Sequence, residues 1–418
     1  MVQAEKDLGK MNGRQLIALL VFMVVLGSAG LVVYRHQNSS WARDGAVIGR
    51  NLLGDLPVND ITRIAIRHGT NEANLIKQDD LWRVRERGDY PANYSQIREF
   101  LLKARDLKVV QTEKVGPSQL ARLQLAGPGQ GTNSALVVEL EGRGGASSRT
   151  LLLGKEHMKP PGRPSQSGGD DPGWPDGRYV KVGNSDSVAL VSDPLENIEP
   201  RPEAWLNKDF VRMEKPKSVE VTFPAGTNSW RLVRESESGE WKLADAKPGE
   251  GLDSAKVSSV SGAPGSLSFA DVLAGGKPGE AATNPATVLR VDTFDGFHYT
   301  VRVGQKTNDD YPVSIAVSAQ IAQERAAGKD EKPEDKSKLD KDFKEALQKL
   351  QDKLKQEQSC GHWTYLVQGW SLDPLLKERS ELLLGKKEES TNDVKASVES
   401  AEKAGLEGTK DSADGATR

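Results

Sequence analysis

The spacing of the apolar positions changes along the chain, and each spacing predicts a different element. An apolar run without charged residues extends over residues 16–34. At ~1.5 Å per residue, a helix of this length reaches roughly the ~30 Å of a bilayer's hydrocarbon core. We therefore expect a transmembrane helix there, preceded by a cytoplasmic tail at residues 1–15. Small residues at 27–30 make a cleaved signal peptide the alternative, but the apolar run continues beyond them, which favours an uncleaved anchor.

After a linker at residues 35–51, two parts of the chain repeat one pattern. Residues 61–86 and 218–245 each contain two segments of alternating apolar and polar residues, followed by a short segment that carries a tryptophan. Alternation with period two is typical of strands with one buried face. The expected correspondences are Ile64 with Val219, Ile66 with Val221, and Trp82 with Trp241.

A predicted helix and further strands follow in both copies of the repeat. Asn93 or Ser95 can cap the first helix, and a weaker, serine-rich helix is expected at residues 252–262. Both copies close with a strand, an Asp-Pro dipeptide and a short helix, and the matching dipeptides are Asp193-Pro194 and Asp373-Pro374. We expect an α+β fold of two tandem repeats, each a mostly antiparallel sheet with packed helices. Copy one is residues 52–213 and copy two is residues 214–384.

Copy two carries a charged insert at residues 319–358, in which Pro333 is expected to separate a shorter helical piece from a longer one. The longer piece has an apolar stripe at helical spacing, which either packs back on its own repeat or contacts a partner. Trp174, in a loop of copy one rich in proline and glycine, is a second candidate contact. The candidate partner contacts are Trp174, Leu339, Phe343, Leu347, Leu350 and Leu354. The polar tail at residues 385–418 is expected to be disordered.

Composition and motifs point to no chemical reaction. The net charge of -3 gives no basic surplus for nucleic acid, and a single cysteine excludes an intrachain disulfide. Cys360 and His362 share one face of a strand start but supply only two metal ligands. Adjacent aspartates at 79–80, 170–171 and 309–310 fit turns better than catalysis. We therefore expect no catalytic residue, cofactor or metal, and we expect these tryptophans in the core: Trp82, Trp205, Trp241, Trp363 and Trp370.

Several segments together resemble a known family. They are LPVNDITRIAI at residues 56–66, LWRVRE with Tyr90-Pro91-Ala92, LLLGKE, RYVKVG and the closing WTYLVQGWSLDPLLKERSELL. With them the chain resembles the bacterial envelope family described as domain of unknown function 4340, over roughly residues 52–384. The resemblance implies one N-terminal membrane helix, a periplasmic body, and genes often next to those of gliding-type ABC transporters.

The expected function is therefore that of a non-enzymatic accessory or scaffold protein of the bacterial cell envelope. It would span the inner membrane once through residues 16–34, with its N-terminus in the cytoplasm, and its partners would be ABC transporter subunits. Two alternatives stay open: a periplasmic ligand- or glycan-binding module, and a periplasmic hydrolase whose catalytic residues converge only in space.

Overall fold

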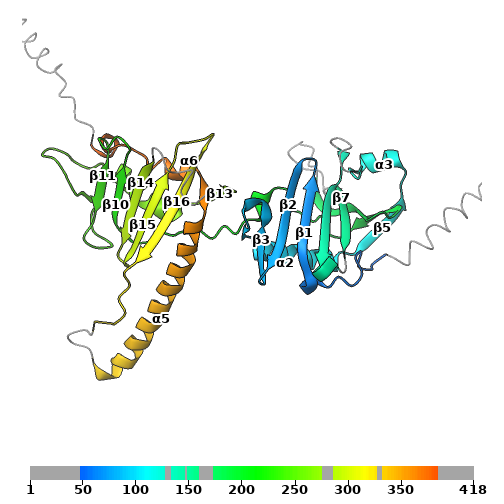
Figure 1. Ribbon diagram of the computed structural model, residues 1–418, viewed down its shortest axis with the longest axis horizontal. Helices are drawn as coiled ribbons and strands as arrows, with labels where there is room; N and C mark the ends of the chain where they lie inside the picture. The colour runs from blue at the N-terminus through cyan, green and yellow to red at the C-terminus, as the bar shows by residue number, and fades with distance from the viewer. Residues whose placement is uncertain are drawn as a thin grey trace, which may run out of the picture. The chain divides into compact units, whose positions relative to one another are not determined.

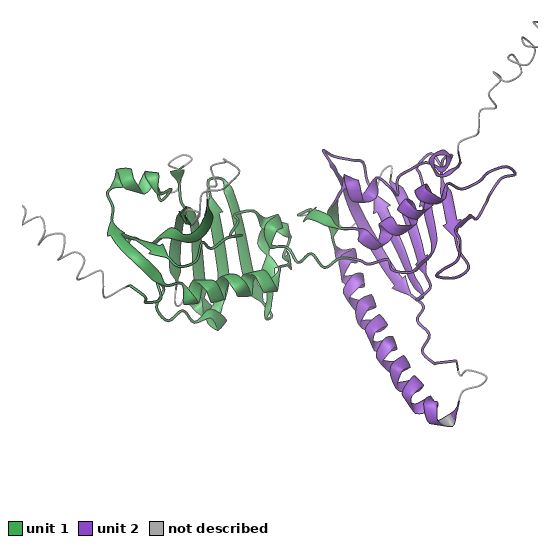
Figure 2. Cartoon of the chain, turned by 180° about the vertical axis from the view of Figure 1, so that it is seen from behind, with its two compact units in different colours: residues 1–210, 268–280, 363–366 green, residues 211–267, 281–362, 367–418 purple. Residues whose placement is uncertain are grey.

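The computed structural model describes residues 48–127, 133–145, 148–159, 173–274, 286–326 and 332–384. The expected transmembrane helix at 16–34 and the expected disordered tail at 385–418 lie outside these residues. No helix in the described ranges is long and apolar enough to cross a membrane. The chain divides into two compact units (Figure 2). Unit 1 is residues 1–210, 268–280 and 363–366, and unit 2 is residues 211–267, 281–362 and 367–418.

The first sheet has nine strands in the order β4-β3-β2-β1-β6-β7-β8-β9-β5 (Figure 1). All eight pairs of neighbouring strands are antiparallel. Its strands are β1 (Ile61–His68), β2 (Asn71–Gln78), β3 (Leu81–Val84), β4 (Tyr90–Pro91), β5 (Val109–Lys114), β6 (Leu136–Gly142), β7 (Arg149–Lys159), β8 (Trp174–Val182) and β9 (Ser187–Val191). The helices that accompany them are α2 (Tyr94–Asp106) and α3 (Pro117–Arg122), and α2 lies across one face of the sheet (Figure 2). The helix buries its apolar side: Ile97, Phe100, Leu101 and Ala104.

The second sheet has eight strands in the order β12-β11-β10-β14-β15-β16-β17-β13. Its strands are β10 (Pro216–Thr222), β11 (Trp230–Val233), β12 (Lys242–Leu243), β13 (Phe269–Val272), β14 (Thr287–Thr293), β15 (Phe297–Val303), β16 (Asp310–Ala319) and β17 (Thr364–Gln368). The helices in this part of the chain are α4 (Ser254–Gly262), α5 (Pro333–Ser359), α6 (Gly369–Leu372) and α7 (Arg379–Leu382).

The two sheets have the same strand order once β4 is set aside, so the predicted internal repeat is confirmed at the level of topology. Strands β1, β2, β3, β6, β7, β8, β9 and β5 match β10, β11, β12, β14, β15, β16, β17 and β13. The register also agrees: Ile64 lies opposite Leu75 and Leu140, and Val219 lies opposite Leu232 and Val291. The same register shift interrupts both first strands, at 61–63 and at 216–218.

The repeat extends to the helix caps and the closing segments. The Asn93 side chain accepts a hydrogen bond from the Gln96 backbone N–H, and Asp253 caps α4 in the same way. The backbone N–H of Asn93 donates to the Trp205 carbonyl at 2.8 Å, and that of Asp253 donates to the Leu382 carbonyl at 3.0 Å. Each N-cap residue therefore makes two stabilising hydrogen bonds. One is through its own side chain, and the other is to the last residue of the 3-10 helix Pro202–Trp205 in copy one or of α7 in copy two.

Two local expectations were wrong. In the described part of the insert α5 is the one helix, and residues 320–326, where a shorter helical piece was expected, are not helical. Strand β7 passes through Gly154 and continues to Lys159. Glycine is needed there because a Cβ would lie 2.3 Å from the Leu123 carbonyl oxygen. Trp370 is 67% exposed rather than in the core, because the chain turns into α6 at the end of β17.

The other tryptophans follow the expectation to different degrees. Trp82 and Trp205 are buried, with exposed fractions of 6% and 0%. Trp241 and Trp363 are half-buried.

Candidate functional site: a helical arm and an aromatic groove

The C-terminal end of α5 is fixed to the second sheet by a buried carboxylate. Glu357 is 4% exposed and accepts hydrogen bonds from the Arg212 backbone N–H at 2.8 Å and from the Tyr299 hydroxyl at 2.7 Å. Lys353, one turn earlier, donates to the Arg212 carbonyl at 2.8 Å, and its ammonium lies 5.2 Å from the centre of the Phe297 ring. Burial raises the pKa of Glu357 above its ordinary value, although the Arg212 N–H and the Tyr299 hydroxyl oppose that shift.

The rest of α5 extends away from the sheet as an arm (Figure 1). Leu339 is 40% exposed, and the other four members of the predicted stripe are half-buried: Phe343, Leu347, Leu350 and Leu354. The segment before the helix contributes one contact to the arm, because the Arg325 guanidinium lies 2.8 Å from the Asp340 carboxylate. The stripe is therefore neither part of the sheet's core nor fully exposed, and its role as a partner contact stays a prediction.

Trp174 is the first residue of β8 and is 51% exposed. It lies opposite Lys159 on β7, whose ammonium is 6.0 Å from the centre of the indole ring. The structure therefore places this candidate contact residue at the surface, on a strand rather than in a loop.

A second feature, which we call the aromatic groove, lies in copy one beside the β2–β3 hairpin. It has a volume of about 460 Å³. Its lining residues are Lys77, Asp80, Leu81, Trp82, Arg83, Pro91, Ala92, Tyr94 and Asn207. The hairpin turn holds Asp79 and Asp80 at positive φ, 48° and 63°, as a tight type I′ turn requires. This turn brings β3 back beside β2, and Tyr94 enters from the other side as the first residue of α2.

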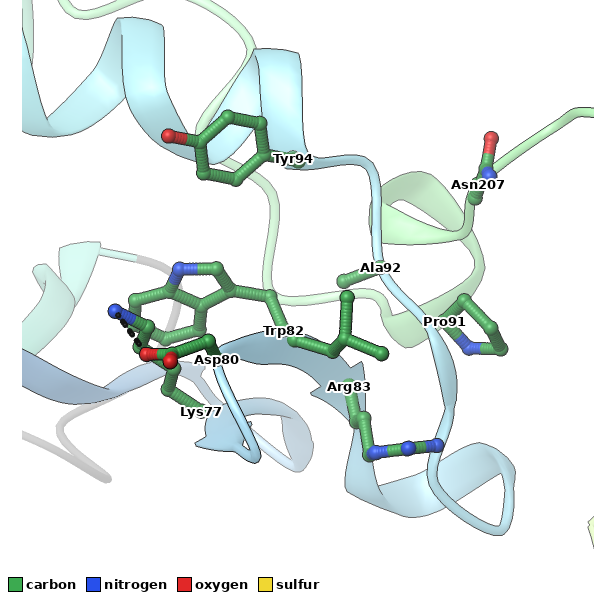
Figure 3. A pocket seen from close by; sticks show the side chains of 9 residues that line it. Lys77, Asp80, Trp82, Arg83, Pro91, Ala92, Tyr94 and Asn207 are labelled. Carbon is green, nitrogen blue, oxygen red and sulfur yellow. Dashed lines mark ion pairs between the residues drawn. The ribbon is translucent and has the colours of Figure 1, made fainter.

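Figure 3 shows the Trp82 indole and the Tyr94 ring on opposite sides of the aromatic groove. Trp82 is 6% exposed and firmly held, whereas Tyr94 is 61% exposed and Leu81 is 60% exposed. Lys77 and Asp80 form an ion pair at 3.4 Å on the rim. The groove therefore combines one fixed aromatic wall with one exposed aromatic wall.

The polar groups of the aromatic groove differ in whether they already have a hydrogen-bond partner within the protein. The Asn207 side chain accepts from the Asp209 backbone N–H at 3.1 Å and donates to the Asp209 carboxylate at 3.2 Å. The indole N–H of Trp82 has no hydrogen-bond acceptor among the described residues, and it is not among their fully buried unsatisfied atoms. A donor without a protein partner that still reaches solvent is available to a ligand.

The matching position in copy two has no such arrangement. Trp241 corresponds to Trp82, because Leu232 pairs with Leu243 as Leu75 pairs with Val84. The Arg234 guanidinium lies 4.8 Å from the centre of the Trp241 ring. The first residue of α4 is Ser254, where α2 has Tyr94. Sequence reasoning missed the aromatic groove, and the mismatch between Tyr94 and Ser254 was the available signal.

Of the residues considered earlier for chemistry, Asp80 lines the aromatic groove and Cys360 directly follows the last residue of α5. Cys360 is buried and His362 is exposed, and among the described residues no group of three or more His, Cys, Asp or Glu side chains could hold a metal ion. Asp79 and Asp80 form the hairpin turn, as expected, while residues 170–171 lie outside the described ranges.

A separate groove of about 410 Å³ contains His157, whose Nδ1 lies 2.6 Å from the Asp176 carboxylate. Among the described residues that line it there is no Ser, Thr or Cys: Glu113, Val115, Gln119, Arg122, Leu123, Lys155, Glu156, His157, Met158 and Tyr179.

Comparison with known proteins identifies a family. The family described as domain of unknown function (DUF4340) matches residues 82–290, which is half of the 418-residue chain. The match begins at Trp82 in the aromatic groove and ends within β14. No curated protein matches the chain, and no solved structure matches it.

Proposed function

Because this chain belongs to the DUF4340 family, we propose that it is a non-enzymatic accessory or scaffold protein of the bacterial cell envelope. Residues 16–34 hold it in the inner membrane as a single-pass anchor, with the N-terminus in the cytoplasm and the two copies in the periplasm. Its partners are the subunits of an ABC transporter. The charge-free apolar run at 16–34 supports the anchor, and the family resemblance supports the transporter.

The arm formed by α5 is the observation that carries this proposal. A helix of 27 residues is fixed at its C-terminal end by Glu357 and Lys353, while its remaining turns extend beyond the sheet (Figure 1). A helix that long is stable in water mainly through contacts of its apolar face, and here that face is only half covered. A partner in the assembled complex would complete its burial.

The spacing of the stripe indicates what kind of partner would fit. Phe343, Leu347, Leu350 and Leu354 follow one another at intervals of four, three and four residues, which is the seam spacing of paired helices. Lys, Glu and Asp cover the other faces of α5 and can select a partner by charge. We therefore propose that the partner contributes a helix to the contact.

Recovery of the complex from native membranes tests this function. The full-length protein would carry an affinity tag after Arg418 and be purified in mild detergent. A variant with Phe343→Ser and Leu347→Ser removes the centre of the stripe. The matched control, Glu345→Ser with Lys349→Ser, changes the opposite, exposed face of the same helix.

Transporter permease and ATPase subunits should be recovered with the wild type and the control, and at least about tenfold less with the stripe variant, which is the effect of losing one or two apolar contacts. Recovery of the protein without transporter subunits would contradict the proposal. Equal recovery of transporter subunits with both variants would show that the stripe on α5 does not contact them.

The proposed topology has a separate test. A reporter that folds only outside the cytoplasm should be active when fused after Arg418, because a single span with a cytoplasmic N-terminus places the C-terminus outside. Activity of a cytoplasm-specific reporter at that position would reverse the proposed orientation.

The aromatic groove favours a second candidate function, that of a periplasmic ligand-binding module. It is a concave, mostly apolar site with a few polar groups, which is typical of ligand sites. The two functions are separable, because the aromatic groove and α5 lie in different copies and can be altered independently.

A further inference from the structure

The walls of the aromatic groove suit a compact, rigid apolar ring. Trp82 forms one wall from β3 and Tyr94 forms the other from the start of α2, with the hollow between them (Figure 3). The exposed Leu81 side chain extends the apolar surface at the rim. Aromatic-lined grooves of this kind bind proline-rich segments, whose polyproline II conformation costs little entropy to hold.

The Trp82 indole N–H and the Lys77 ammonium bring hydrogen-bond donors to the aromatic groove, beside the Tyr94 hydroxyl, which can donate or accept. The Trp82 indole N–H has no acceptor among the described residues, and the Lys77 ammonium has three donors, of which Asp80 engages one. The Asn207 side chain oxygen already accepts the Asp209 N–H. Proline complements this set, because its carbonyl accepts a hydrogen bond and it has no N–H that would need an acceptor.

The backbone beside the aromatic groove is already paired, which argues against a ligand that adds a strand. The Ala92 N–H donates to the Trp82 carbonyl at 2.8 Å, and the Asn207 N–H donates to the Pro91 carbonyl at 2.9 Å. β-Strand addition needs a free edge, whereas a polyproline II segment is recognised through side chains. The charges add a preference: the residues that line the aromatic groove include Lys77 and Arg83 but one carboxylate, Asp80, so the lining is net positive.

We propose that the aromatic groove binds an extended, proline-containing peptide segment of neutral or acidic character. The prolyl ring lies between Trp82 and Tyr94, and a carbonyl of the segment accepts the indole N–H. A glycan is the competing ligand class. It fits less well, because sugar hydroxyls need several free polar partners.

Fluorine NMR of the full-length protein in detergent, labelled with fluorotryptophan, tests this directly. The Trp82 resonance is assigned from a Trp82→Phe variant. The probe is a capped Pro-Pro-Glu-Pro-Pro-Glu peptide, and the control peptide has Ala at every Pro. Tyr94→Ala removes the exposed wall at a surface position, and Trp174→Ala is the matched control, since it removes an exposed aromatic outside the aromatic groove.

The proline peptide should shift the Trp82 resonance saturably, and the alanine peptide should bind at least about tenfold more weakly. Tyr94→Ala should weaken binding by about tenfold, which is the worth of one aromatic contact, while Trp174→Ala should leave it unchanged. Unchanged melting of Tyr94→Ala shows that the variant is folded.

Absence of any shift with the proline peptide at millimolar concentration would overturn the proposal. A saturable shift with a soluble oligomer of N-acetylglucosamine in its place would assign the aromatic groove to glycans. Equal binding by Tyr94→Ala would also overturn the proposal. None of these results depends on a transporter partner, so peptide binding by the aromatic groove is tested independently of the proposed accessory function.

Discussion

Copy one and copy two share a sheet and differ in what is attached to it. The strand order, the register shift in the first strand and the doubly satisfied N-cap are the same in both. Copy one leaves Trp82 beside a hollow and places Tyr94 opposite, whereas copy two covers Trp241 with Arg234 and carries the α5 arm. The common sheet thus acts as a scaffold, and each copy has acquired its own surface feature in a connection or at an edge.

The largest expected effect is on the free energy of unfolding, and it tests whether Trp205 in copy one and Leu382 in copy two have equivalent roles. Trp205 is 0% exposed, donates its indole N–H to the Glu199 carbonyl at 2.8 Å, and occupies the place that Leu382, also 0% exposed, has in copy two. Trp205→Ala should lower the free energy of unfolding by about 3–5 kcal/mol, and Leu382→Ala by about 2–4 kcal/mol. Urea unfolding of the full chain in detergent measures both.

Hydrogen exchange read by mass spectrometry supplies the control for these two variants. Protection should fall mainly in α2 for Trp205→Ala and mainly in α4 for Leu382→Ala, because each closing segment bonds to the N-cap of its own helix. The reverse pattern would show that the closing segments are not equivalent.

An effect of intermediate size on stability is expected at Trp241, which differs from its counterpart Trp82 in its contact with Arg234. Arg234 covers the Trp241 ring and donates its Nε–H to the Pro216 carbonyl at 2.7 Å. Arg234→Ala should cost about 1–2 kcal/mol of unfolding free energy, from one cation–π contact and one hydrogen bond. Tyr94→Ala, its counterpart at the aromatic groove, should change the unfolding free energy by less than about 0.5 kcal/mol, because Tyr94 is 61% exposed. Equal costs in thermal or urea unfolding would show that the Arg234 contact with Trp241 adds no more to stability than the exposed Tyr94 side chain does.

The smallest expected effect is on the pH dependence of stability, at the contact of Glu357 that fixes α5 to the second sheet. Copy one has no helix between the matching strands β8 and β9. Burial raises the folded-state pKa of Glu357, and the nearby Glu214 adds to the rise, while the Arg212 N–H, Tyr299 and Lys353 oppose it. Because the pKa is higher in the folded than in the unfolded protein, this group's contribution to stability is complete below the unfolded value of 4.5 and is lost as the pH rises through the folded value. Glu357→Gln does not titrate.

Relative to the wild type, Glu357→Gln should therefore lose less than about 1 kcal/mol at acid pH, the worth of one altered hydrogen bond, and the gap should narrow as the pH rises. Unfolding free energies of both proteins across this range provide the measurement. A gap that widens with pH would mean that Glu357 is stabilised as the carboxylate, contrary to the burial argument.

Periodicity predicted the sheets well, because apolar and polar residues alternate along strands with one buried face. Ile64 and Val219 were matched from that alternation, and their register agrees. The extent of the helices was harder to predict: Pro333 marks the start of α5, but the described residues 320–326 before it form no helix. A charged segment with few apolar positions shows no periodicity that would distinguish a helix from an extended chain. The aromatic groove was not predicted, because Trp82 and Tyr94 face each other only through a tight turn and a helix entry that spacing does not encode.

Site-specific photo-cross-linking in native membranes tests the central claim, that the second copy's arm is the partner-binding part of a duplicated scaffold. A photoreactive residue at position 347, on the stripe, is compared with one at position 345, on the exposed face of the same helix. We expect a cross-link from position 347 to an ABC transporter subunit and none from position 345. Equal cross-linking from both positions, or none to a transporter subunit from position 347, would contradict it.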